Sequence, residues 1–269
     1  MKIGSQANKA SAISGSNEAT ILVRGHDLTN ELIGQIGFTD HFWLLLTGAF
    51  PTAAQRRVLD ATLVAIAEHG LVPSVQAARM TLAAAPEALQ GAVAAGILGC
   101  GSVVLGSSEA AGIFFASIAK RIDAGAAVAD AAKAAVLECR AAHRPVPGYG
   151  HPLHKDFDPR ARRLFEVAKE AGGSGRHAQI ALAVESLLPE MLGKRLALNV
   201  SAAIPAVLLD VGYPLAALKG VPLLARTAGL IAHLLEEQQR PIGFVMSYAA
   251  AAAIDYDGAA PPGFEPSHE

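Results

Sequence analysis

Apolar residues recur along most of the chain at the three- and four-residue spacing that places them on one face of an α-helix. Leu59, Leu63 and Ile66 share such a face, and Gly70 closes this helix. No long stretch alternates apolar with polar residues, so the pattern predicts almost no strand and an all-α fold. The predicted helices span residues 27–36, 39–48, 54–69, 74–84, 88–98, 107–122, 127–143, 160–171, 176–188, 197–210, 223–234 and 241–254.

An uncharged run from Ala88 to Ser108 is long enough to cross a bilayer. The chain as a whole is apolar, with 52% hydrophobic residues and a mean hydropathy of +0.34. The run owes its apolar character mostly to Ala and Gly and also carries Gln and Ser, which is typical of packed core helices. We therefore interpret it as a buried helix pair broken near Gly99 and Gly101, and we expect no membrane partner.

The charges and the cysteines narrow the classes of partner. With 22 basic and 24 acidic side chains the net charge is −2, so nucleic acid is not expected as a ligand. Cys100 and Cys139 form neither a metal-ligand spacing nor a disulfide framework, and the N-terminus lacks the apolar core of a signal peptide. We expect a reduced, cytoplasmic protein.

The segment 143–152 interrupts the helical pattern with three prolines and two glycines, and the residues after it are crowded with His, Asp and basic side chains. Loops held between rigid helices often carry binding groups, so we expect chemistry here. His151, His154, Asp156 and Asp158 are of the types that bind metals, but their spacing matches no metal signature, and no metal site is predicted.

Two arginines stand where a cation is costly. Arg226 lies in an apolar helix, where its charge needs an anion, either an internal partner or a ligand. Arg160 follows Asp-Pro in the first turn of a helix, where the helix dipole disfavours a cation unless an anion is also present. Several arginines together with a histidine would suit a small polycarboxylate, because the planar guanidinium binds a carboxylate through two hydrogen bonds.

The segment Pro147-Gly-Tyr-Gly-His-Pro-Leu-His-Lys-Asp-Phe-Asp-Pro-Arg160 resembles the signature loop of the citrate synthase superfamily. The resemblance covers nearly the whole chain from about Arg24. The short length is similar to that of citryl-CoA lyases and of the lyase module of ATP-citrate lyase. Further matching segments are Glu68-His-Gly70, Leu198-Asn-Val200, Ala225-Arg-Thr-Ala-Gly229 and Gln239-Arg-Pro241.

This resemblance implies an all-helical homodimer, or a larger even assembly, whose subunits have a large and a small domain with the active site in the cleft. The large domain is expected to comprise residues 1–104 with 213–256. The small domain is expected at 105–212 and carries the Pro-Gly-Tyr-Gly-His loop, and residues 257–269 are expected to form a mobile tail. Arg240 is expected to reach into the site of the partner subunit.

The resemblance also implies roles for individual residues. The catalytic positions are His151 and Ser201. The ligands of the di- or tricarboxylate are His69, Arg160, Arg226 and Arg240. The coenzyme A contacts are Val146, Gly148, Tyr149 and Gly150. No cofactor is expected to be bound permanently, since coenzyme A enters as part of the substrate.

Two positions depart from the synthase pattern. Val104 stands where synthases have the histidine that stabilises the enol, a histidine that lyase modules also lack. Ser201 stands where the family has its catalytic aspartate, and a hydroxyl is no base at neutral pH. His151 can accept the proton of a tertiary hydroxyl. The proton donor to the released carbon stays open between Ser201 and three further side chains: Asp210, Glu109 and His154.

The leading hypothesis is therefore cleavage of citryl-CoA, or of a related 3-hydroxy polyacid acyl-CoA, to acetyl-CoA and oxaloacetate. A decarboxylase or another lyase of a related acyl-CoA comes second, because decarboxylation generates an enolate without a carbon base. A citrate or methylcitrate synthase comes third. A non-catalytic homologue that binds coenzyme A or a tricarboxylate is the remaining alternative, since Ser201 replaces the aspartate.

Overall fold

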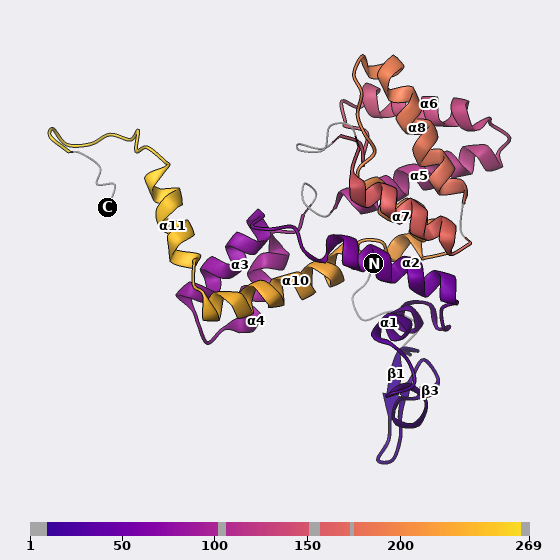
Figure 1. Ribbon diagram of the computed structural model, residues 1–269, viewed down its shortest axis with the longest axis horizontal. Coiled ribbons are helices and arrows are strands. Elements are labelled where there is room, and N and C mark those ends of the chain that lie inside the picture. Colours follow the sequence, from indigo (N-terminus) through magenta and orange to yellow (C-terminus); the bar gives the residue numbers. More distant parts are fainter. Residues whose placement is uncertain (1–9, 102–105, 151–156, 173–174, 265–269) are drawn as a thin grey trace. The chain divides into compact units, whose positions relative to one another are not determined.

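The computed structural model describes residues 10–101, 106–150, 157–172 and 175–264 (Figure 1). The fold is mostly helical, as predicted, and the chain divides into two compact units. Unit 1 comprises residues 1–62 and 109–218, and unit 2 comprises residues 63–108 and 219–269. Residues 1–62 thus fall in a unit with the Pro-Gly-Tyr-Gly-His loop, whereas the sequence placed them with the C-terminal helices. The assignment of large and small domains stays a prediction.

The N-terminal part of unit 1 is a small antiparallel sheet of the strands β1 (Ser14–Ser16), β2 (Ile21–Val23) and β3 (His26–Asp27). These three short strands agree with the prediction of almost no strand, but the predicted helix over 27–36 was wrong. Only Leu28–Leu32 is helical, as a single π-helical turn capped by the carboxylate of Asp27. These strands are too short for an alternating pattern to show. Arg24 and Gly25 form the two-residue turn between β2 and β3, with φ of 52° and 88°. The glycine, which accepts a positive φ readily, was the sequence feature that could have indicated this hairpin.

Five of the predicted helices and most of two others belong to unit 1. Their bounds are α1 (Phe38–Thr47), α2 (Ala53–Ala67, as far as Thr62), α5 (Ser107–Asp123, from Glu109), α6 (Val128–Ala141), α7 (Pro159–Glu170), α8 (Arg176–Leu192) and α9 (Val200–Asp210). Helix α9 is the buried centre: α7 and α8 pack against it, α6 packs against α8, and its residues from Ala202 to Leu208 are all buried. The unit thereby holds the N-termini of α7 and α9, where several predicted site residues lie, on a rigid core.

Unit 2 is built from α3 (Pro73–Ala84), α4 (Leu89–Leu98), α10 (Gly220–Gln239) and α11 (Gly243–Ala252) (Figure 1). Helix α3 packs against the other three. The core consists of Val75, Ala78 and Leu82 from α3, Ala92 from α4, and Leu230 and Leu234 from α10. The three α3 residues recur at helical spacing, so one face of α3 supplies much of this core.

The uncharged run from Ala88 to Ser108 is not one continuous helix. Helix α4 ends at Leu98 with Gly99 as its C-cap, and α5 begins at Ser107, so the break lies where the sequence predicted it. By length and composition alone, Leu215–Gln239 could cross a membrane. This stretch carries two buried charged residues, Arg226 and Glu237, and its helix packs against α3 and α4.

Candidate functional site

The loop ahead of His151 is fastened to the segment that leads into α9. The Gly150 N–H donates to the Ala197 carbonyl at 2.7 Å, and the Asn199 N–H donates to the Gly148 carbonyl at 3.0 Å. The Asn199 side-chain amide donates to the Gly150 carbonyl at 2.6 Å, and Tyr149 forms a β-bridge with Leu198. Helix α9 therefore starts at Val200 and not at 197 as predicted, because residues 197–199 are extended and pair with this loop.

Gly148 and Tyr149 show why this loop needs its sequence. Gly148 has φ +87°, and a Cβ there would lie 2.5 Å from the Ala202 Cβ, so glycine is required. The Tyr149 hydroxyl donates to the Ala181 carbonyl at 2.8 Å, and burial raises its pKa well above the ordinary value. Tyr149 thus anchors the loop through its side chain. Val146 is also buried, and the predicted contacts of this loop with coenzyme A stay a prediction.

Asp158 joins the start of α7 to the start of α9. It is 2% exposed, and as the N-cap of α7 it accepts the Arg160 N–H at 3.0 Å. The same carboxylate binds Nε and Nη2 of the Arg160 side chain at 3.1 and 2.9 Å and accepts the Val200 N–H at 2.9 Å. The anion that the position of Arg160 demanded is therefore Asp158, which the sequence offered only as a metal donor.

The electrostatics of Asp158 follow from these contacts. Burial alone would raise its pKa, but the hydrogen bonds from Arg160 and Val200 outweigh burial and lower the pKa below the ordinary value. Asp158 is therefore ionised at neutral pH and holds the Arg160 guanidinium, whose side chain is 23% exposed, beside the first turn of α9.

Ser201 lies in that first turn, where Asn199, the N-cap, accepts its N–H at 2.9 Å. Asp210, one of the side chains considered as a proton donor, lies at the other end of α9, about 14 Å away at 1.5 Å per residue. Its carboxylate instead caps α8, accepting the His177 and Ala178 N–H groups at 2.8 and 3.0 Å. Asp210 therefore does not replace the missing aspartate beside Ser201. Glu109 lies in the first turn of α5, and His154 lies outside the described residues.

Arg226, on α10 in unit 2, is 2% exposed and has no ion pair among the described residues. Its Nε and Nη1 are buried and have no hydrogen-bond partner there, and the buried Ser74 hydroxyl likewise has none. Burial raises the pKa of the neighbouring Cys100 thiol, and the positive charge of Arg226 opposes that shift. The internal anion that would neutralise Arg226 is thus missing from the part of the chain that the structure describes, which leaves a cationic site suited to an anionic ligand.

His69 and Arg240 also belong to unit 2, and both are exposed. His69 follows Glu68, whose carboxylate contacts Nε2 of His233 at 2.8 Å. Arg240 is the C-cap of α10, with a side chain 81% exposed and 3.8 Å from the Glu236 carboxylate. The segments that contain these two residues are connected through Arg79, a buried arginine that the sequence analysis missed.

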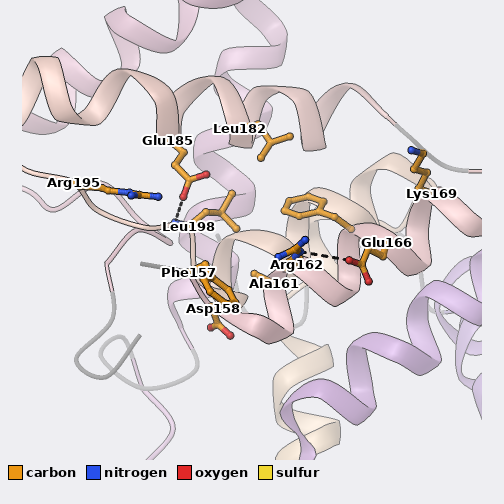
Figure 2. A pocket seen from close by; sticks show the side chains of 11 residues that line it. Phe157, Asp158, Ala161, Arg162, Glu166, Lys169, Leu182, Glu185, Arg195 and Leu198 are labelled. Atoms are coloured by element: carbon orange, nitrogen blue, oxygen red, sulfur yellow. Dashed lines mark hydrogen bonds and ion pairs between the residues drawn. The ribbon is translucent and has the colours of Figure 1, made fainter. Parts of the chain in front are cut away.

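A pocket of about 520 Å³ lies beside the loop junction in unit 1 (Figure 2). Its apolar wall includes Phe157, Phe165, Leu182 and Leu198. The charged residues around it are Asp158, Arg162, Glu166, Lys169, Glu185 and Arg195. Glu185 accepts the Leu198 N–H at 2.7 Å and Glu166 pairs with Arg162, whereas Lys169 and Arg195 have no such contact among the described residues. An aromatic wall with free cations suits a flat ring that carries phosphates.

The structure therefore groups the predicted residues by unit. Arg160, Ser201 and the loop 146–150 come together in unit 1, and Arg226, His69 and Arg240 belong to unit 2. His151 and Val104 lie outside the described residues, as do two of the other possible metal donors, His154 and Asp156. Within the described ranges, no group of three or more His, Cys, Asp or Glu side chains could hold a metal ion.

Sequence comparison connects this geometry with known proteins. Residues 38–243 match the family described as citrate synthase, C-terminal domain. Citrate synthase from Deinococcus radiodurans is 28% identical over 203 residues, which are 74% of this chain and 52% of that protein. The chain spans about half the length of the citrate and 2-methylcitrate synthases that it matches.

Two solved structures share the fold over almost the whole chain. Citryl-CoA lyase from Hydrogenobacter thermophilus is 32% identical, with a TM-score of 0.82 over 95% of this chain and 97% of that chain. ATP citrate lyase from Methanothrix soehngenii, solved with citrate and coenzyme A, is 22% identical, with a TM-score of 0.74 over 96% of this chain and 43% of that chain. The fold is citrate synthase-like, the class whose enzymes act on acyl-CoA. The chain belongs to the citrate synthase family.

Proposed function

We propose that this protein cleaves citryl-CoA, or a related 3-hydroxy polyacid acyl-CoA, into acetyl-CoA and oxaloacetate. The observation that carries the proposal is the buried Arg226, whose unpaired N–H groups call for an anionic ligand. The likeness to a citryl-CoA lyase, at 32% identity and a TM-score of 0.82, supports a lyase.

In the proposed reaction, a base removes the proton of the tertiary hydroxyl, the carbon–carbon bond breaks, and its electron pair leaves as the enolate of acetyl-CoA. The oxygen becomes the carbonyl of oxaloacetate, and the enolate carbon then takes up a proton. His151 is the proposed base. Arg160, Arg226 and Arg240, with His69, are the proposed ligands of the carboxylates, which they orient for cleavage.

Coenzyme A has two proposed contacts in unit 1. The loop 146–150 is one, and the adjoining pocket is the other. In that pocket the aromatic wall suits the adenine ring, and the uncommitted Lys169 and Arg195 suit the phosphates.

The serine at position 201 favours a second candidate. A decarboxylase of a related polyacid acyl-CoA would form its enolate by loss of carbon dioxide, so it would not need the aspartate that Ser201 replaces. Such an enzyme would use the same carboxylate ligands, and it differs from the lyase in releasing carbon dioxide and no oxaloacetate.

Incubation of the purified protein with citryl-CoA tests the proposal. Oxaloacetate is measured by coupling to malate dehydrogenase, and carbon dioxide is measured in parallel. We expect oxaloacetate and acetyl-CoA in equal amounts, and loss of both products in His151→Ala. Oxaloacetate release no faster than without protein would refute the lyase. Release of carbon dioxide from an acyl-CoA that carries a carboxylate on the carbon next to its thioester would support the second candidate.

A further inference from the structure

A second buried arginine in unit 2 differs from Arg226 in that each of its three nitrogens has an acceptor. Arg79, on α3, is 2% exposed. Its Nε donates to Glu237 at 2.6 Å, Nη1 donates to Glu236 at 2.7 Å, and Nη2 donates to the backbone carbonyl of Arg240 at 3.2 Å. Burial works against its charge, but the two carboxylates raise its pKa above the ordinary value. One side chain thus holds the last turn of α10 and the residue that caps it.

Glu237 connects Arg79 to the start of the next helix, α11. Its carboxylate is also buried and accepts the Ile242 N–H at 3.0 Å and the Gly243 N–H at 2.7 Å, at the start of α11. A Cβ on Gly243 would lie 2.5 Å from the Ala83 Cβ, so α11 sits tightly against α3 at this point. The backbone on both sides of Arg240 is therefore fixed from the inside, while its guanidinium points outward.

His233 connects Arg79 to Glu68, in the segment that contains His69. Its Nδ1 lies 3.5 Å from Nη1 of Arg79, and its Nε2 lies 2.8 Å from the Glu68 carboxylate. A guanidinium only donates and a carboxylate only accepts, so Nε2 carries the hydrogen and Nδ1 the lone pair. The other oxygen of Glu68 accepts the Gly70 N–H, which fixes the segment that contains His69.

We propose that Arg79 is a positioning residue of the polycarboxylate site, because its buried guanidinium binds the backbone carbonyl of Arg240 directly and is connected through His233 to Glu68 in the segment 68–70. This inference rests on the proposed function, in which His69 and Arg240 bind the carboxylates. Arg79 itself is not proposed to touch the substrate, because each of its three nitrogens already has an acceptor within the chain. Its contribution is rigidity. A substrate-binding side chain whose backbone is already fixed by packed contacts loses less conformational entropy when the substrate binds.

Removing Arg79 would leave Glu237 buried without its partner, so two milder variants make the test. Glu236→Gln keeps the shape of the side chain but weakens its contact with Nη1 of Arg79. Because Glu236 is half exposed, this variant leaves no buried charge without a partner. Arg79→Lys keeps the positive charge, but a single ammonium group cannot reach all three acceptors that the guanidinium binds. The matched control is Glu138→Gln, which alters an exposed carboxylate that binds Arg121 through two 2.7 Å contacts in unit 1.

Citrate binding by calorimetry, citryl-CoA kinetics and backbone hydrogen exchange are measured for each variant. We expect citrate to bind about three- to tenfold more weakly in both variants, with a matching rise in KM and kcat within about twofold. Exchange should quicken in residues 68–70 and 240–243 together, with the thermal midpoint of Glu236→Gln unchanged. Glu138→Gln should match the unmodified protein.

The outcomes separate the two proposals. Unmodified protein that binds citrate, with variants that bind it equally tightly or exchange faster at only one of the two segments, would overturn the role of Arg79 alone. Unmodified protein that neither binds citrate nor cleaves citryl-CoA would overturn the proposed function, and the role of Arg79 with it. Weaker citrate binding without any cleavage would support the role of Arg79 while refuting the lyase.

Discussion

The two buried arginines of unit 2 make a natural contrast. Arg226 and Arg79 are each 2% exposed, yet only Arg79 has carboxylate partners among the described residues. A buried charge without a partner costs stability, so a protein that keeps one needs it for something other than folding. Free energies of unfolding can therefore separate a structural arginine from a ligand-binding one.

We predict opposite effects when each is changed to methionine, which has a similar length and no charge. Arg226→Met should raise the free energy of unfolding without ligand by about 1–3 kcal/mol, while Arg79→Met should lower it by about 3–5 kcal/mol because Glu237 loses its partner. Chemical denaturation measures both values. Citrate should raise the thermal midpoint of the unmodified protein and leave that of Arg226→Met unchanged.

Equal destabilisation by the two substitutions would contradict this prediction, because it would mean that Arg226 has an internal anion. The sequence showed that both Arg226 and Arg160 need an anion, but it left open whether that anion is internal. Asp158 answers the question for Arg160, although the sequence analysis considered it only as a metal donor. The apolar face of α3 contained Arg79 at a helical position between Val75 and Leu82, so that residue could also have been found.

At the scale of the elements, helical periodicity predicted every helix from α1 to α11, because each buries one apolar face, but α10 spans Gly220–Gln239 and is longer at both ends than the predicted 223–234. It could not show how their ends are joined. The hydrogen bonds of Asp158 to Val200 and of Asn199 to Gly150 connect segments far apart in the sequence, and no local pattern encodes them. The family motif named these segments as functional, and the structure shows that they are also held together.

Asp158 should make the junction of α7 and α9 sensitive to acid. Its folded-state pKa is lowered, despite burial, by its hydrogen bonds with Arg160 and Val200. Its contribution is therefore complete above its ordinary value of 3.8 and is lost as the pH falls further, because the unfolded chain binds the proton first. Asn at this position keeps the helix cap but has no such titration.

We predict that Asp158→Asn lowers the free energy of unfolding by about 1–3 kcal/mol at neutral pH. The difference between the two proteins should shrink as the pH falls from 5 towards 3. Denaturation curves at several pH values measure this difference, in which the effects of all other carboxylates cancel. A difference that is the same at every pH would show that the charge of Asp158 contributes nothing.

At the scale of the whole molecule, the exposed Arg240 is the residue on which the prediction of a second subunit depends. Its guanidinium is 81% exposed, although buried contacts of Arg79 and Glu237 fix the backbone around it. Rigid backbone beneath an outward-pointing arginine suits a contact with something outside the subunit. The family resemblance implies that this is the site of the partner subunit, and we adopt this as a prediction.

Hybrid dimers test it directly. His151→Ala and Arg240→Ala should each inactivate the homodimer. In a dimer of one subunit of each kind, purified through two different tags, one of the two sites would combine an intact His151 with Arg240 from the other chain. If the subunits form a symmetric dimer with shared sites, this hybrid should recover about half of the citryl-CoA cleavage of the unmodified dimer. If Arg240 serves its own subunit, both sites of the hybrid remain defective and no activity returns. A doubly tagged dimer of two His151→Ala subunits is the control for activity gained by purification alone, because neither of its sites can be completed.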